Sequence, residues 1–220
     1  TASFAQAVVP MYFRMWEQQG REKTIDFIQQ ALKYYLALAL PILAGMAAVG
    51  PELLRLLASS KYAVSTELIV FIVGGMLVSG GTPIFSAGIY INKLTKVVMY
   101  SVLVAAAVNL VLTTVLVRPF GIEGAAFAAL VSYVLYTALA AYYGRKVIQI
   151  RMPWIDFVKY SLFSILMYYI VISVHPSAAF YRLFLQILTG AIVYSVLVIV
   201  FDAQIRNLLV RAVQSVRAKS

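Results

Sequence analysis

Two cations and one amide have the types and positions best suited to binding chemistry. Arg14 directly follows an apolar stretch, Lys33 opens the next apolar run, and Asn109 lies inside a later one. Beside a cavity, the cations suit an anionic head group and the amide suits a polar substrate. The alternatives are that the cations reach from a helix end to water and that the amide bonds to a neighbouring helix. Arg14, Lys33 and Asn109 are our candidate substrate-binding residues.

Glycine and proline interrupt two of the apolar runs. One run holds four glycines and a proline, namely Gly74, Gly75, Gly80, Gly81 and Pro83. Proline removes a helical hydrogen bond, and paired glycines loosen the helix around it, which is typical of transport sites and hinges. The alternative is close helix packing through small residues. Our candidate hinge residues are Pro41, Gly80, Gly81 and Pro83.

The sequence contains no arrangement typical of an enzyme or a metal site. There is no cysteine and one histidine, His175, so thiolate metal sites, disulfides and histidine-based triads lack the residues they need. It also has no glycine-rich phosphate loop, nucleophile elbow or HExxH motif. We predict a protein that is not an enzyme and that uses no cofactor and no metal.

The composition indicates a membrane protein. Of the 220 residues, 63% are hydrophobic and 12% are charged, whereas soluble domains average about 45–50% and about 25%. Six charge-poor runs approach the roughly 20 apolar residues that a spanning helix needs, at 34–50, 68–92, 97–117, 124–143, 157–174 and 183–201. We predict an all-α, polytopic transmembrane bundle over residues 1–201. Residues 1–12 resemble the end of a truncated span, and the chain lacks an initiator Met, so we expect a piece of a longer protein.

The positive charges predict the orientation of these spans. Alternate hydrophilic segments hold fourteen and four of the 18 Lys and Arg residues. By the positive-inside rule, the segments richer in positive charge and the C-terminus lie in the cytoplasm. We expect the spans to lie in the plasma (inner) membrane. The same distribution explains the net charge of +10 without a nucleic-acid partner. Residues 202–220 carry apolar side chains at helical spacing, which predicts an amphipathic tail on the cytoplasmic leaflet.

Several stretches resemble one family of transporters. They are the segment Pro51–Leu57 with Lys61 and Tyr62, the segment Phe85–Lys93, and Arg118-Pro-Phe-Gly-Ile-Glu-Gly-Ala-Ala126 leading to Ser132 and Tyr133. They are similar to the oligosaccharide flippases, the polysaccharide transporter family of the multidrug/oligosaccharidyl-lipid/polysaccharide superfamily. The resemblance covers about residues 31–146 well and the last two spans less well.

The resemblance implies a two-lobe fold of which this chain is the C-terminal part, so the missing N-terminal lobe becomes a partner. It also implies a function: moving polyprenyl-diphosphate-linked oligosaccharide from the cytoplasmic to the outer leaflet by alternating access, for biosynthesis of O-antigen, capsule or exopolysaccharide. The other partners are then the lipid-linked oligosaccharide and membrane lipid.

Two alternatives remain open at this point. One is another exporter of the same superfamily, carrying drugs with a coupling cation or a peptidoglycan precursor. The other is a membrane enzyme of glycan assembly, for which a large outer loop with acidic or Arg/His pairs is expected. The loops here are short and contain no such pair.

Overall fold

The structure, a computed structural model, describes residues 2–58, 65–146, 148–174 and 179–206. These residues form six helices: α1 (Ala2–Ala58), α2 (Thr66–Phe85), α3 (Ala87–Ile91), α4 (Thr95–Gly144), α5 (Trp154–Ile172) and α6 (Ala179–Phe201). No strand occurs within the described ranges, which confirms the all-α prediction. Most of the predicted amphipathic tail, residues 207–220, lies outside them.

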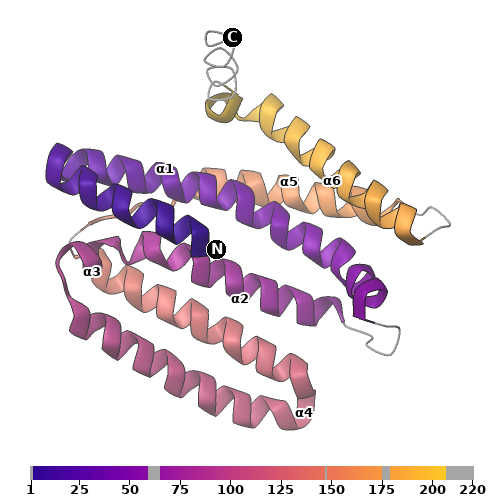
Figure 1. Cartoon of the computed structure of the whole chain (residues 1–220), viewed down its shortest axis with the longest axis horizontal. Helices are drawn as coiled ribbons and strands as arrows, with labels where there is room; N and C mark the ends of the chain where they lie inside the picture. Colours follow the sequence, from indigo (N-terminus) through magenta and orange to yellow (C-terminus); the bar gives the residue numbers. More distant parts are fainter. Residues whose placement is uncertain (1, 59–64, 147, 175–178, 207–220) are drawn as a thin grey trace.

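Two glycines reverse the chain inside the two longest helices. Gly20 in α1 has φ 81° and ψ −175°, and Gly121 in α4 has φ 56° and ψ −134°. Positive φ values are readily adopted by glycine because it lacks a Cβ atom. α1 and α4 are therefore each two antiparallel arms, as Figure 1 shows. The arms of α1 are residues 2–19 and 21–58, and those of α4 are residues 95–120 and 122–144.

The boundaries of α2 follow from local chemistry. The Ser65 hydroxyl caps the helix by accepting a hydrogen bond from the Leu68 N–H at 3.1 Å. Pro83 has no N–H to donate, and α2 ends two residues later, before Ser86. α3 then continues the chain for one short turn. The apolar run at 68–92 is therefore two helices with a break at Ser86.

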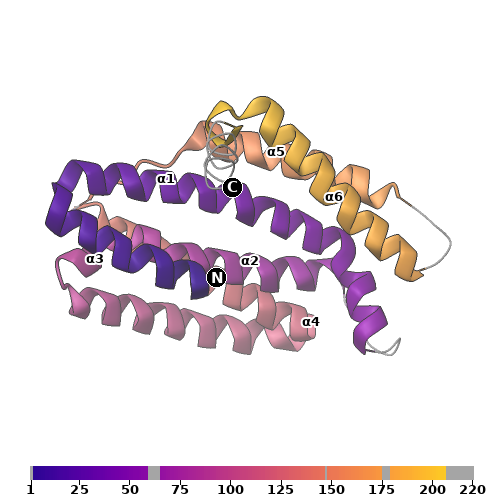
Figure 2. The same ribbon diagram turned by 45° about the horizontal axis from the view of Figure 1, so that its top comes forward.

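The second arm of α1 is the central element of the bundle. On one side it packs against α2, which in turn packs against α4, and α3 joins the same group. On the other side it carries the α5–α6 hairpin (Figures 1 and 2). Among the described residues, α5 and α6 pack on α1 and on each other, and not on α2, α3 or α4. The chain thus has two regions joined through one helix.

Each of the two regions packs on α1 through its own apolar clusters. Tyr12, Ile28, Leu32 and Ile84 are almost fully buried where the two arms of α1 meet the end of α2. A second cluster joins α5 and α6 to the far part of α1 and includes Met167. A third joins the same helices nearer to Lys33 and includes the buried Tyr160, Ala37 and Val198.

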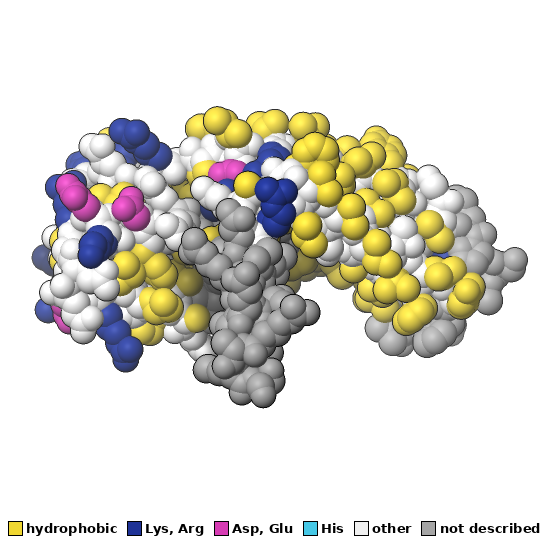
Figure 3. All heavy atoms as spheres, turned by 90° about the horizontal axis from the view of Figure 1, so that it is seen from above, with side chains coloured by type: hydrophobic (Ala, Val, Ile, Leu, Met, Phe, Trp, Pro, Cys, Tyr) yellow, Lys and Arg dark blue, Asp and Glu magenta, His cyan; other side chains and the backbone are white. Residues whose placement is uncertain are grey.

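The outer surface of the bundle is apolar along most of its length. Within the part of the chain that the structure describes, five helices are long and apolar enough to cross a membrane. Large hydrophobic side chains such as Leu110 and Ile155 are 70% and 86% exposed, which costs free energy in water and none in hydrocarbon. On the face in Figure 3, charged side chains gather at one end and near the middle, and hydrophobic ones cover the other end. The chain is a multi-pass membrane protein.

Candidate functional site

The glycines of α2 bring this helix close to two neighbours. A Cβ atom at Gly81 would lie 3.0 Å from Cε1 of Tyr35 in α1, and one at Gly75 would lie 3.2 Å from Cδ2 of Tyr133 in α4. The Tyr35 hydroxyl donates a hydrogen bond to the Leu77 carbonyl, so the ring is held across the α1–α2 contact. Gly80 is buried as well. Gly81 and Gly75 therefore have a packing role in this conformation; the predicted part of Gly80 and Gly81 in a hinge stays a prediction.

The two prolines differ in what they do to their helices. α1 keeps helical dihedral angles through Pro41, since Gly20 is its only non-helical residue. Next to Pro83, the side chain of Thr82 makes hydrogen bonds within α2 and to α4. The Thr82 hydroxyl donates to the Val78 carbonyl at 3.1 Å and lies 2.7 Å from the Thr137 hydroxyl of α4. The end of α2 is thereby fixed to α4 by a polar contact.

An apolar groove of about 690 Å³ runs along Gly74 and Gly81 of α2. Its lining comes from the second arm of α1, from α2, from the second arm of α4 and from the start of α5. The positions include Leu36, Leu43, Gly74, Gly81, Leu130, Ala138, Met152, Trp154 and Phe157. Of the predicted hinge residues, Gly81 lines this groove directly.

Lys33 belongs to an ionic cluster next to one end of this groove. Its Nζ lies 3.4 Å from Oδ1 of Asp156 and 3.4 Å from Oδ2 of Asp202. Lys159 completes the cluster: its Nζ is 2.9 Å from Oδ1 of Asp156, and it also pairs with Asp202. We call these four residues the ionic cluster; it joins α1, α5 and the end of α6. The charge of Lys33 is therefore compensated within the bundle in this conformation.

Asp202 is the most buried member of the ionic cluster, with its side chain 1% exposed. Burial alone favours the protonated acid, but the charges and hydrogen bonds around it favour the carboxylate more. Lys159 donates to it, and the N–H of Ile205 donates at 3.1 Å. The Tyr160 hydroxyl donates at 2.7 Å. These groups, with the charge of Lys33, hold the pKa of Asp202 well below its usual range.

Arg14 and Asn109 lie apart from this cluster. Arg14 is exposed on the first arm of α1, and Asn109 is partly buried on the first arm of α4. That arm contributes few buried residues to the bundle, namely Ser101 and Ala105. The structure thus places Gly81 on the groove and Lys33 in the ionic cluster, and Arg14 and Asn109 belong to neither.

Sequence reasoning missed the acidic partners of Lys33 and a second ion pair. Arg182 at the start of α6 pairs with Glu52 of α1, and the Ser65 hydroxyl donates to Oε1 of Glu123 at 2.5 Å. The available signal was the position of the acids, because Asp156 and Asp202 flank the ends of apolar runs just as the lysines do. Each contact joins segments that the charge count assigns to the same side of the membrane.

Comparisons with known proteins agree with this architecture. The chain matches no protein-family profile. A curated relative, the probable low-salt glycan biosynthesis flippase Agl15 of Haloferax volcanii, is 20% identical over 209 residues, which cover 92% of this chain and 44% of the relative. The solved structure of the lipid II flippase MurJ, in an inward closed conformation, aligns with a TM-score of 0.74 and 20% identity over 94% of this chain and 44% of that one. This chain has the MurJ fold.

Both of these proteins are named as flippases, which confirms the resemblance to a flippase found in the sequence. The chain spans less than half the length of each. The fold is therefore that of one part of a larger flippase-like bundle, and the matched part includes both the α1–α4 region and the α5–α6 hairpin, since nearly the whole chain is covered.

Proposed function

We propose that the chain is the C-terminal part of a transporter that flips polyprenyl-diphosphate-linked oligosaccharide from the cytoplasmic to the outer leaflet, for the biosynthesis of a surface polysaccharide. The observation that carries this proposal is the match of almost the whole chain to two flippases of lipid-linked substrates or glycan pathways. The chain would sit in the plasma membrane with its C-terminus in the cytoplasm, as the distribution of Lys and Arg favours.

Arg14 is the cation that we propose for the diphosphate. It is exposed on the first arm of α1, whereas Lys33 is paired with two carboxylates. A guanidinium binds phosphate oxygens in a bidentate fashion and stays charged at all relevant pH values. Asn109, partly buried on the first arm of α4, is our candidate for a contact to the sugars. Gly80, Gly81, Pro83 and Pro41 are proposed to accommodate the change between inward and outward conformations.

A deletion of the full-length gene tests the proposal in the cell. We expect lipid-linked oligosaccharide to be held in the cytoplasmic leaflet and surface polysaccharide to be lost, while synthesis of the oligosaccharide continues. Complementation with Arg14→Gln should restore less export than complementation with Arg118→Gln, an exposed arginine on α4 that serves as the matched control. Normal surface polysaccharide after deletion would contradict the proposal.

A peptidoglycan precursor is the second candidate substrate, and the fold shared with a lipid II flippase favours it. The same deletion separates the two candidates, because each predicts a different accumulating lipid. Accumulation of lipid-linked peptidoglycan precursor with unchanged polysaccharide would favour the second candidate.

A further inference from the structure

The apolar groove lies between two regions that do not pack on each other. Trp154 and Phe157 at the start of α5 line one part, and α2 and α4 line another, with α1 between them. Its lining in α1 and α2 falls largely within the apolar runs at 34–50 and 68–92. The groove is therefore at the depth of the hydrocarbon core of the membrane.

The two hydroxyl groups in this lining already have partners. The Tyr35 hydroxyl is bonded to the Leu77 carbonyl, and the Thr137 hydroxyl lies 2.7 Å from that of Thr82. A water molecule needs two to four polar partners to remain in a cavity. The groove offers hydrocarbon surface instead, so a hydrocarbon chain is the occupant that suits it.

The size of the groove limits that chain. A volume of about 690 Å³ falls within the range of about 300–1,000 Å³ that is usual for sites of small ligands. It accommodates one acyl chain and not the whole of a long polyprenyl tail. This favours a lipid of the bilayer over the carrier lipid of the proposed substrate.

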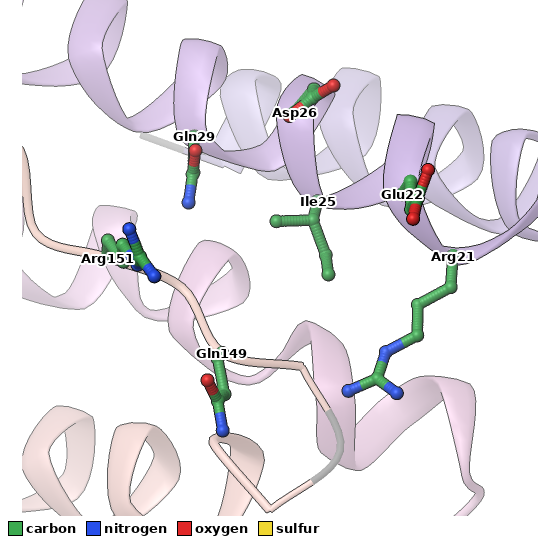
Figure 4. A pocket seen from close by; sticks show the side chains of 7 residues that line it. All are labelled: Arg21, Glu22, Ile25, Asp26, Gln29, Gln149 and Arg151. Carbon is green, nitrogen blue, oxygen red and sulfur yellow. The ribbon is translucent and has the colours of Figure 1, made fainter.

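A polar hollow of about 430 Å³ has lining residues that are close in sequence to those of the groove. It contains Arg151, whose neighbour Met152 lines the groove, and Gln29, one turn before Leu32 of the groove. Figure 4 shows Arg21 and Gln149 on the same hollow, and its lining also includes Glu22 and Asp26. Guanidinium groups suit a phosphate and carboxylates suit an ammonium group, so the two charge signs fit a zwitterionic head group.

We propose that the groove and the polar hollow together bind one bilayer phospholipid with an amine-bearing head group. The acyl chain lies in the groove, the phosphate lies by Arg151, next to the groove residue Met152, and the amine lies by Glu22 and Asp26. The bound lipid fills the space between the α5–α6 hairpin and the α2–α4 pair, and so takes part in the packing of the two regions.

Native mass spectrometry of the full-length protein from nanodiscs tests this proposal. The nanodiscs contain equal amounts of phosphatidylethanolamine and phosphatidylglycerol. We expect the wild type to retain one phosphatidylethanolamine. Ala138→Trp should lose this adduct because it fills the groove from an exposed wall position, whereas Ala106→Trp, on an exposed alanine of the other arm of α4, should keep it. If Ala138→Trp does not fold, Val134→Trp, at a groove position 48% exposed, replaces it.

The head group is tested in the same experiment. Asp26→Asn removes a carboxylate beside the amine, so it should keep an adduct but lose the preference for phosphatidylethanolamine over phosphatidylglycerol. Glu17→Gln, at an exposed acid on the first arm of α1, should keep the preference. Equal retention in Ala138→Trp and Ala106→Trp, retention of the two lipids in the proportions of the nanodisc, or an adduct with the mass of a polyprenyl carrier lipid would each overturn the proposal.

Discussion

The α1–α4 region and the α5–α6 hairpin are both attached to the second arm of α1, but by different chemistry. Within the first region, backbones approach closely through glycine. A Cβ atom at Gly88 would lie 2.4 Å from the carbonyl oxygen of Gly144. The hairpin is attached by side chains: the ionic cluster at one end, the Glu52–Arg182 pair at the other, and apolar clusters between them.

The two regions therefore respond to different changes. A contact between backbones is sensitive to added volume, because neither partner can move without moving a helix. A contact between charged side chains is sensitive to loss of charge and to pH. Variants that add a methyl group in one region and remove a charge in the other therefore test this difference.

The largest effect is expected for Gly88→Ala. The added methyl group collides with backbone atoms of Gly144, and overpacking of this kind costs about 3 kcal/mol. Gly45→Ala is the matched control, because its Cβ atom would meet only Cε of Met167, at 3.9 Å. Thermal unfolding in detergent measures both. Equal melting temperatures for the two variants would refute the close backbone contact.

The next largest effect is expected for Asp202→Asn. It leaves the two lysines of the ionic cluster with one carboxylate, and loss of a largely buried partner costs about 2 kcal/mol here, less than in a fully buried pair because both lysines are partly exposed. In limited proteolysis, the variant should be cleaved between α4 and α5 faster than the wild type. The exposed Glu17→Gln serves as control. Unchanged proteolysis would mean that the cluster does not hold the hairpin.

A smaller effect is expected for Glu52→Gln at the other end of the hairpin. The side chains of Glu52 and Arg182 are 23% and 32% exposed, so solvent screens the pair and its loss costs about 0.5–1 kcal/mol. The loss of stability in the double variant Glu52→Gln/Asp202→Asn should equal the sum of the losses in the two single variants, because the two contacts are at opposite ends of the hairpin. Unfolding midpoints of the three proteins test this, and strong non-additivity would contradict two independent attachments.

The smallest effect is a pH dependence of the ionic cluster. The pKa of Asp202 is lowered in the folded state, so its contribution is fully present above its unfolded pKa of about 3.9 and is lost as the pH falls through the folded value. The difference in melting temperature between the wild type and Asp202→Asn should be constant from pH 7 to pH 5 and should shrink below about pH 4. A difference that already shrinks between pH 7 and pH 6 would point to another titrating group.

The all-α fold could be predicted from the sequence because each spanning helix needs its own long apolar run. The reversal at Gly121 falls between the predicted spans at 97–117 and 124–143. The sequence does not reveal that the helix continues up to this glycine from both sides. Pro83 marks the run at 68–92 as interrupted, but the run carries no charge, so the sequence does not show that the helix ends at Ser86 and a new one begins. Local pattern therefore predicts the helices better than their ends.

The candidate site was less accessible to sequence reasoning. Lys33 was recognised as a cation at the end of a run, but Asp156 and Asp202, which lie near it in space, are far from it in the chain. Pairing across such distances depends on how helices pack, which a single sequence does not encode locally. The groove along Gly81 was not predicted for the same reason, because three helices and the start of a fourth build it.

The most direct test of the proposed function is a flipping assay with the purified full-length protein in liposomes. A fluorescent lipid-linked oligosaccharide is placed in both leaflets, and a membrane-impermeant reductant then bleaches what reaches the outside. The proposal predicts that the protein exposes the inner pool to the reductant and that Arg14→Gln slows this while Arg118→Gln does not. Protection of the inner pool equal to that in protein-free liposomes would contradict the proposal.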